Sequence, residues 1–287
     1  LERRIIAAND LGTRFSQLAT DGMEEDGFTD YMGIPLIAKG AVKGVLEIFN
    51  RGPLPEDSQW LNLLDSMASQ AAIAIDNATL FEDVQTANES LRQAYDATIE
   101  GWARALELRD GDTEGHSSRV ATLAVQLARL VGMKEPELIA LRRGALLHDI
   151  GKMGIPDTIL LKSTDLTDKE WQIMRMHPIL GKNMLSSIEF LKDSLDVAYC
   201  HHEKWDGTGY PEGLKGEQIP LAARIFSVID GWDALRSDRP YRVAVSDEEA
   251  WKYIEENIGK AYDPRIVEKF KIMMKGQLSG GGEDLVS

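Results

Sequence analysis

The stretch that decides the fold is Ala-Leu-Leu-His148-Asp149-Ile-Gly-Lys152-Met-Gly-Ile-Pro156, at residues 145–156. It sets an imidazole beside a carboxylate at the end of an apolar helix, and a lysine and a Gly/Pro break follow. Burying a histidine next to an aspartate is unfavourable unless a partner compensates for their lost hydration. A metal ion is such a partner, so we expect the surrounding helices to pack around a metal site.

All five histidines of the chain fit one metal cluster together with two aspartates. Each group lies on the apolar stripe of a predicted helix or beside a helix end. A single histidine in such a place is more often a hydrogen-bonded core residue than a ligand, but seven groups in this pattern favour a metal centre. The candidate ligands are His116, His148, Asp149, His177, His201, His202 and Asp230.

The spacing of these ligands favours two ions. Adjacent residues on a helix diverge by about 100°, because about 3.6 residues make one turn. His148-Asp149 therefore suits a pair of ions with the carboxylate bridging them, and the same reasoning applies to His201-His202. Imidazole and carboxylate ligands without a thiolate suit iron, manganese or zinc better than calcium or magnesium. Two ions about 3.5–4 Å apart are the usual device for hydrolysing phosphate esters.

A glycine-rich loop directly follows the paired histidines and contains Trp205 and Tyr210. Glycine permits tight turns and close backbone approach, and the two aromatic side chains are able to stack on a base. An ordinary surface loop is the alternative, but its place after two presumed ligands favours a functional role. Further along, Arg239 and Arg242 are either solvated charges or, beside a metal cleft, bidentate phosphate ligands.

The first part of the chain predicts a hairpin. Residues 31–38 form an apolar strand, whose Pro35 favours an edge position or a bulge. Lys39-Gly40 predicts the turn, and residues 41–50 alternate as a second strand.

Helical periodicity then runs from Trp60 to about Leu108. Apolar or small residues recur there at spacings that mostly alternate between four and three, as in a heptad seam. We expect a parallel two-chain coiled coil, and hence a homodimer through residues 80–108; a surface helix lying on either domain is the alternative. The seam consists of Leu80, Val84, Ala87, Leu91, Ala94, Thr98 and Trp102.

The first region resembles the C-terminal half of a GAF domain. Residues 32–51, Met-Gly-Ile-Pro-Leu-Ile-Ala-Lys-Gly-Ala-Val-Lys-Gly-Val-Leu-Glu-Ile-Phe-Asn-Arg, look like the late hairpin of that family, and residues 70–78 look like its closing helix. The resemblance implies either a ligand-binding domain or a dimer-forming structural remnant. The chain begins at Leu1 without a methionine, so we expect that it is a fragment of a longer protein and that the family's early strands lie before it.

Residues 98–275 resemble an HD-GYP domain, a branch of the HD phosphohydrolase superfamily. The resemblance implies hydrolysis of the bacterial second messenger cyclic di-GMP through two or three metal ions, often iron or manganese. The motifs that carry it are Gly-His116-Ser-Ser-Arg-Val, His148-Asp149-Ile-Gly-Lys152-Met-Gly-Ile-Pro, Met-His177-Pro, His201-His202-Glu-Lys-Trp-Asp-Gly-Thr-Gly-Tyr210-Pro and Asp230-Gly-Trp-Asp-Ala-Leu-Arg-Ser-Asp-Arg239-Pro-Tyr-Arg242.

The resemblance also implies a role for each matching residue. The seven candidate ligands would hold the ions, with Asp149 as the bridge between two of them. Lys152 would contact the phosphate or the attacking hydroxide, and Tyr210 would lie in the loop that closes on substrate. Arg239 and Arg242 would hold phosphates.

A third ion depends on one further carboxylate. Some members of the family carry a glutamate one turn before the first histidine of the motif series. Asp112 occupies that position here, with a side chain shorter by one methylene, and Asp110 and Glu114 are nearby alternatives.

Composition limits the partners. The 47 acidic residues outnumber the 32 basic ones, so the net charge of −15 argues against broad binding of DNA, RNA or anionic membranes. The single cysteine, Cys200, suits a reducing cytosol, and we expect a cytoplasmic protein. The chain contains no apolar run of transmembrane length and no secretory signal.

Together these patterns predict a mainly α protein, with an all-helical HD-type bundle joined by a long helix to a partial α+β GAF-like domain. The expected function is metal-dependent hydrolysis of the 3′–5′ phosphodiester bonds of cyclic di-GMP to linear pGpG and, by a second cut, GMP. Cyclic GMP-AMP or another nucleotide as substrate, or a non-catalytic docking module, are the alternatives. The expected domains are 1–79 (GAF-like), 80–108 (coiled-coil linker), 109–275 (catalytic) and 276–287 (disordered tail).

Overall fold

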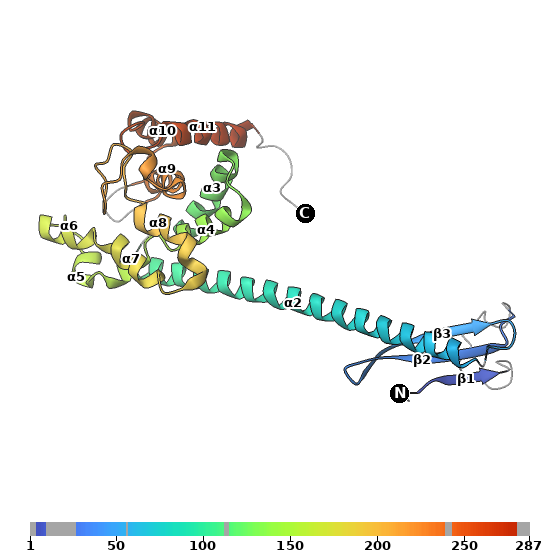
Figure 1. Ribbon diagram of the computed structural model, residues 1–287. Helices are drawn as coiled ribbons and strands as arrows, with labels where there is room; N and C mark the ends of the chain where they lie inside the picture. Colours follow the sequence, from blue (N-terminus) through green and yellow to red (C-terminus); the bar gives the residue numbers. More distant parts are fainter. Residues whose placement is uncertain (1–3, 10–26, 56, 112–114, 239–242, 280–287) are drawn as a thin grey trace. The chain divides into compact units, whose positions relative to one another are not determined.

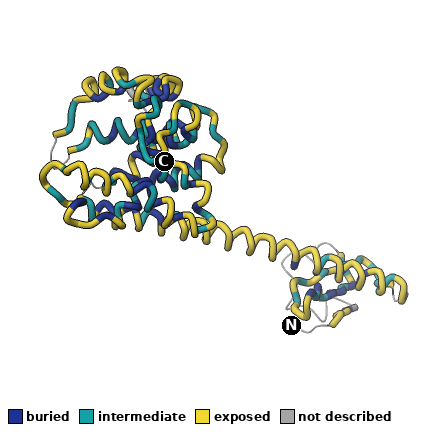
Figure 2. The backbone as a smooth tube through the Cα atoms, turned by 60° about the vertical axis from the view of Figure 1, so that its left-hand side comes forward, coloured by how far each residue is buried: buried dark blue, intermediate teal, exposed yellow. Residues whose placement is uncertain are grey.

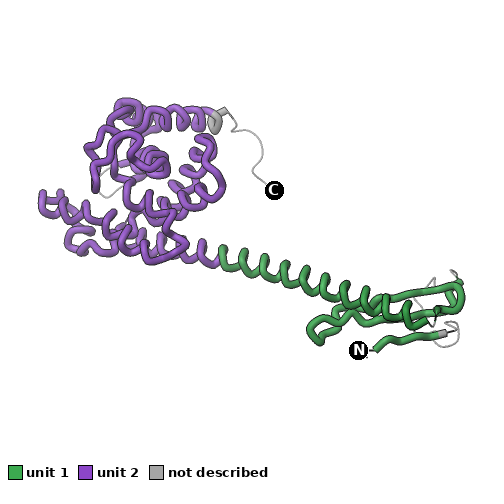
Figure 3. Tube along the Cα trace, viewed as in Figure 1, with its two compact units in different colours: residues 1–92 green, residues 93–287 purple. Residues whose placement is uncertain are grey.

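The computed structural model forms two compact units, Leu1–Arg92 and Gln93–Ser287 (Figure 3). The first combines a small sheet with a helix, and the second is helical, so the mainly α fold is confirmed. The predicted tail lies largely outside the described residues. The structure describes residues 4–9, 27–55, 57–111, 115–238 and 243–279.

The sheet of the first unit is antiparallel with strand order β1-β2-β3 (Figure 1). Alternate side chains of β2 are apolar and buried, because successive residues of a strand point to opposite faces. They pack on buried Leu64, Ala68 and Ala72 of the following helix. The strands are β1 (Ile6–Asn9), β2 (Asp30–Ala38) and β3 (Ala41–Asn50), and the helix is α2 (Ser58–Asp110).

The turn at Lys39-Gly40 is confirmed, and Pro35 lies beside a bulge, one of the two positions that the sequence favours for it. β2 is the middle strand of the three that the structure describes. β1 pairs with β2 only as far as Gly33, so Pro35 has a described partner on one side alone, Val45 of β3. Proline has no N–H to donate, and this is tolerated where no neighbouring strand is hydrogen-bonded on that side of the residue. The register of the pair also shifts between Leu36 and Ile37, next to the proline.

Helix α2 runs for 53 residues. At a rise of about 1.5 Å per residue it is about 80 Å long. Residues 77–95 are exposed throughout and form the long yellow stretch in Figure 2. Leu80, Val84, Leu91 and Trp102 of the expected seam are all exposed. The coiled coil stays a prediction, because it needs a second chain.

The second unit packs helices around one apolar core, with α9 beside α3, α8, α10 and α11 (Figure 1). The capping boxes that begin α6 at Thr167 and α10 at Ser246 match the S/T-x-x-E pattern of the sequence. The elements are α3 (His116–Val131), α4 (Glu135–Leu146), η1 (Ile150–Gly154), α5 (Asp157–Leu160), α6 (Asp168–Met174), α7 (His177–Leu185), η2 (Glu189–Ser194), α8 (Leu195–Cys200), η3 (Gly216–Gln218), α9 (Leu221–Arg236), α10 (Asp247–Glu256) and α11 (Pro264–Ser279).

In the described part of the chain, every helix is too short or too polar to cross a membrane.

Candidate metal centre

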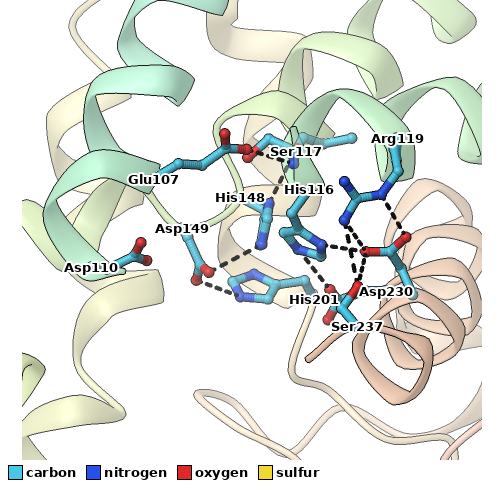
Figure 4. A network of polar contacts seen from close by, with 12 residues as sticks. Glu107, Asp110, His116, Ser117, Arg119, His148, Asp149, His201, Asp230 and Ser237 are labelled. Carbon is cyan, nitrogen blue, oxygen red and sulfur yellow. Dashed lines mark hydrogen bonds and ion pairs between the residues drawn. The ribbon is translucent and has the colours of Figure 1, made fainter. Parts of the chain in front are cut away.

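The seven candidate ligands come from five places in the helical unit and converge on one site. Figure 4 labels five of them, His116, His148, Asp149, His201 and Asp230. Most of them lie where a helix begins or ends, because backbone direction changes there and side chains of several helices meet. His116 begins α3 and His177 begins α7, while the two adjacent pairs follow α4 and α8. Asp230 lies within α9.

The ligands form two neighbouring groups. In each group, one ligand atom per residue lies within 4.8 Å of the others. The first group is Asp149, His177, His201 and His202; the second is His116, His148 and Asp230.

Asp149 lies between the two groups. Its Oδ1 faces the first group, 3.2 Å from His177 Nε2, and its Oδ2 faces the second, 3.1 Å from His148 Nε2. Oδ1 is buried and accepts no hydrogen bond. A buried carboxylate oxygen without a donor is costly unless a cation lies beside it. This geometry fits a carboxylate that bridges two ions.

Backbone carbonyls orient three of the imidazoles. His148 Nδ1 donates to the carbonyl of Ala145 at 2.8 Å, because a carbonyl oxygen can only accept. His177 donates to Met174 at 2.9 Å, and His201 donates to a carbonyl of α8 in the same way, at 3.0 Å. The Nε2 lone pair of each neutral ring is therefore free for a metal ion.

One contact requires a cation more directly than the others. His177 Nε2 and His201 Nε2 lie 3.2 Å apart, and Asp149 Oδ1 lies 3.2 and 3.7 Å from them. Since the Nδ1 atoms of both rings carry the hydrogens, two Nε2 lone pairs and a carboxylate oxygen face one another. These charges repel unless a positive ion lies among them. The donor set therefore fits a divalent metal ion.

The adjacent ligand pairs behave differently. His148 and Asp149 lie in different groups, whereas His201 and His202 lie in the same one. The geometry therefore favours one shared ion for the second pair, whereas helical spacing suggested two. The two ring centroids lie 4.1 Å apart.

Charges and burial keep Asp149 and His202 in metal-binding forms, whereas, against the effect of burial, the Asp149 carboxylate raises the pKa of His148. Burial opposes ionisation of Asp149, but Lys152 and His148 outweigh it and hold the pKa of that carboxyl well below its usual range. Burial, together with the neighbouring imidazoles, lowers the pKa of His202 well below its ordinary value. A carboxylate and a neutral imidazole are the forms that bind metal ions.

Lys152 is held by two carboxylates rather than pointing freely into the site. Its Nζ lies 2.7 Å from Asp149 Oδ2 and 3.0 Å from Asp110 Oδ2. Burial opposes its charge, but the two carboxylates raise the pKa of Lys152 above its usual value. Arg109 donates to the carbonyls of Lys152 and Ile155, so the last turn of α2 fixes the segment that carries the lysine.

Sequence reasoning missed a set of supporting side chains. Asp233 Oδ2 accepts a hydrogen bond from His116 Nδ1 at 2.7 Å, and Arg119 binds both oxygens of that carboxylate at 3.1 Å. Glu107 accepts from the backbone N–H groups of Gly115 and Ser117, at the start of α3 (Figure 4). The spacing of three between Asp230 and Asp233 was the available signal, since such residues share a helix face.

Buried Glu203 organises the glycine-rich loop. Its carboxylate accepts three backbone N–H groups, from Glu212 at 2.8 Å, from Gly213 at 3.1 Å and from Leu214 at 3.0 Å. The loop places the Tyr210 ring on the His202 ring, with centroids 4.6 Å apart and planes inclined by 26°. Tyr210 therefore lies beside the metal-ligand candidates.

Four predicted or alternative site residues lie outside the described residues: Asp112, Glu114, Arg239 and Arg242. Of the three carboxylates considered for a third ion, Asp110 is described. Its side chain is nearly buried and pairs with Lys152.

Comparison with known protein families identifies the family to which the domain carrying this site belongs. The model of the HD domain family matches residues 102–266, more than half of the chain, and includes all seven candidate ligands. The chain belongs to the HD domain family. The GAF domain model matches residues 1–75. Both resemblances inferred from motifs are thus confirmed at the level of family.

Relatives of this HD domain protein are phosphodiesterases by name. The chain is 42% identical over 173 residues to the cyclic di-GMP phosphodiesterase response regulator RpfG of Xanthomonas campestris, covering 60% of this chain and 46% of that protein. It is 44% identical over 166 residues to a cyclic di-GMP phosphodiesterase of Thermotoga maritima, covering 57% and 45%. It is 37% identical over 182 residues to the 3′3′-cGAMP-specific phosphodiesterase 3 of Vibrio cholerae, covering 63% and 40%. The chain thus spans less than half the length of these three relatives.

Proposed function

We propose that this HD domain protein is a metal-dependent phosphodiesterase that hydrolyses cyclic di-GMP to linear pGpG and, by a second cut, to GMP. The observation that carries the proposal is the convergence of His177 Nε2, His201 Nε2 and Asp149 Oδ1, which a divalent ion would hold together. Two relatives, whose matches cover 60% and 57% of this chain, are named as cyclic di-GMP phosphodiesterases.

The seven candidate ligands would hold two divalent ions, iron or manganese by their mixed imidazole and carboxylate donors. When bound, such ions lower the pKa of water and neutralise the charge on phosphoryl oxygens. Asp149 would bridge the two positions. Asp112 would be the ligand for a third ion, with Asp110, which pairs with Lys152, and Glu114 as the alternatives.

The remaining residues would bind and orient the dinucleotide. Lys152 Nζ lies 2.7 Å from Asp149 Oδ2, and from there it would contact the phosphate or the attacking hydroxide. Tyr210 lies on His202 and would contact the substrate from the loop. Arg239 and Arg242 would each hold a phosphate through two N–H groups, because the guanidinium fork matches phosphate oxygens.

A second substrate has specific support. A relative that is 37% identical is named as specific for 3′3′-cyclic GMP-AMP, and the match covers 63% of this chain. Cyclic GMP-AMP is therefore the alternative substrate for the same reaction. Non-catalytic docking is disfavoured, since all the candidate ligands are present and oriented for metal binding.

The expected dimer remains part of the proposal. The exposed apolar residues Leu80, Val84 and Leu91 repeat at spacings of four and seven, which suits a partner helix. A second copy of this chain, in parallel register through residues 80–108, would cover them.

Turnover by a ligand-deficient variant tests the function. The metal-loaded protein, kept under reducing conditions, is expected to convert cyclic di-GMP to pGpG. The double variant His148→Ala, Asp149→Ala removes one ligand from the second group and the bridging carboxylate, so its turnover should fall to background. Near-normal hydrolysis by the double variant would refute the assignment of the site.

A further inference from the structure

A row of neighbouring aromatic and basic side chains extends from the metal centre on the side of the glycine-rich loop. It begins at His202, on which Tyr210 stacks. The guanidinium carbon of Arg175 lies 5.4 Å from the centroid of the Tyr210 ring and 5.9 Å from that of Trp171. Arg175 and Trp171 are exposed, whereas Tyr210 is half-buried. The row therefore connects a candidate ligand with solvent.

Arg175 differs from the other cations near the centre. Lys152 is paired with two carboxylates, and Arg119 is bound to Asp233. Arg109 donates to backbone carbonyls. The Arg175 guanidinium forms no ion pair or hydrogen bond within the described part of the chain, and its contacts there are with the two rings. Its N–H donors are available to a ligand.

The chemistry of this group matches a guanine base. The guanidinium is planar, so its donors form a directed fork rather than a point charge. Two aromatic rings lie beside it, with centroids 5.4 and 5.9 Å from its carbon. Guanine presents two acceptors, N7 and O6, on one edge, whereas adenine presents an acceptor and a donor there. Unpaired bases are also bound by stacking on aromatic rings and guanidinium planes.

We propose that Arg175 binds the N7/O6 edge of one guanine of the cyclic dinucleotide, with Trp171 and Tyr210 holding its plane, and so selects guanine over adenine. This inference rests on the proposed function. A phosphate, which is anionic, would be the alternative partner for an arginine, but a phosphate contact does not distinguish the bases.

The test compares Arg175→Ala and Arg175→Lys with wild type on cyclic di-GMP and cyclic di-AMP. Cyclic di-AMP is measured as a substrate or, if it is not cleaved, as a competitive inhibitor of cyclic di-GMP hydrolysis. Lys169→Ala, which removes an exposed cation from the same helix, is the control. Metal content and thermal unfolding establish that each variant retains the centre; Arg175 is exposed, so its replacement leaves the core intact.

Arg175→Ala should lower kcat/KM for cyclic di-GMP about tenfold to a hundredfold, mainly through KM, because a bidentate arginine–guanine contact discriminates by about 1–3 kcal/mol. Arg175→Lys should lose less, since a lysine also donates to guanine N7 and O6. The constants for cyclic di-AMP should change much less, and Lys169→Ala should match wild type. Equal losses of Arg175→Ala on both dinucleotides, or no loss on cyclic di-GMP, would overturn the inference. If wild type cleaves no cyclic dinucleotide, the proposed function itself fails, and the inference fails with it.

Discussion

At the scale of single residues, the orientation of the imidazoles indicates what the site binds. Backbone carbonyls fix three of the rings, so their orientation follows from the fold and cannot be altered by changing a side chain. His116 is different, because the carboxylate of Asp233 accepts its Nδ1 hydrogen. The ring and Arg119 hold the pKa of Asp233 at about 2 against the opposing effect of burial, so the carboxylate is ionised at neutral pH.

Replacing Asp233 with asparagine tests this support. The variant keeps the shape of the side chain but removes the charge that orients His116, so metal affinity should fall about tenfold to a hundredfold, the usual effect of losing such a partner. Calorimetric titration of the metal-free protein with Mn²⁺ measures the change. Ser237→Ala is the control, since its hydroxyl touches the same carboxylate only at 3.4 Å. Unchanged affinity in Asp233→Asn would contradict the role.

At the scale of elements, the centre depends on a close contact between η1 and α7. A Cβ atom on Gly151 would lie 1.8 Å from the carbonyl oxygen of His177, so no side chain fits there. The same contact brings Asp149, which directly precedes η1, to His177 at the start of α7. The glycine of the His-Asp-Ile-Gly motif is thus required by packing.

Gly151→Ala should therefore force the two elements apart. We expect a loss of about 1–3 kcal/mol in the free energy of unfolding, as for other overpacked sites, together with weaker metal binding. The control is Gly101→Ala in α2, where a Cβ meets nothing within 4 Å. That variant should gain about 0.5–1 kcal/mol, because alanine favours the helix interior. Urea unfolding of both variants measures the difference; equal stabilities would refute the packing argument.

At the scale of the whole molecule, the exposed face of α2 is the feature that a single chain does not explain. Leu91 lies in the middle of the expected seam and is 49% exposed. An aspartate there would place like charges opposite each other in a two-chain coiled coil.

Leu91→Asp should convert the dimer to a monomer, as measured by light scattering. Ser90→Asp adds the same charge one position away, about 100° around the helix, and should leave the dimer intact. A Leu91→Asp protein that scatters as a dimer would exclude this seam.

The local patterns of the chain predicted much of this molecule. The paired motifs, the capping boxes and the hairpin turn depend on neighbours in sequence, so they could be identified there. Asp233 could not be assigned, because its partner His116 lies 117 positions away and only packing brings them together. Pro35 was expected at an edge or a bulge, and only the strand pairing shows that it lies beside a bulge in the middle strand. The grouping of His201 with His202 depends on how their side chains pack, which helical periodicity alone does not give.

The most direct test of the account is the number of metal ions bound per chain. Elemental analysis of protein purified anaerobically should find at least two iron or manganese ions per chain in wild type. It should find fewer in Asp149→Ala, because that carboxylate faces both groups of ligands. Less than one ion per chain in wild type, or a content unaffected by Asp149→Ala, would contradict a shared two-ion centre.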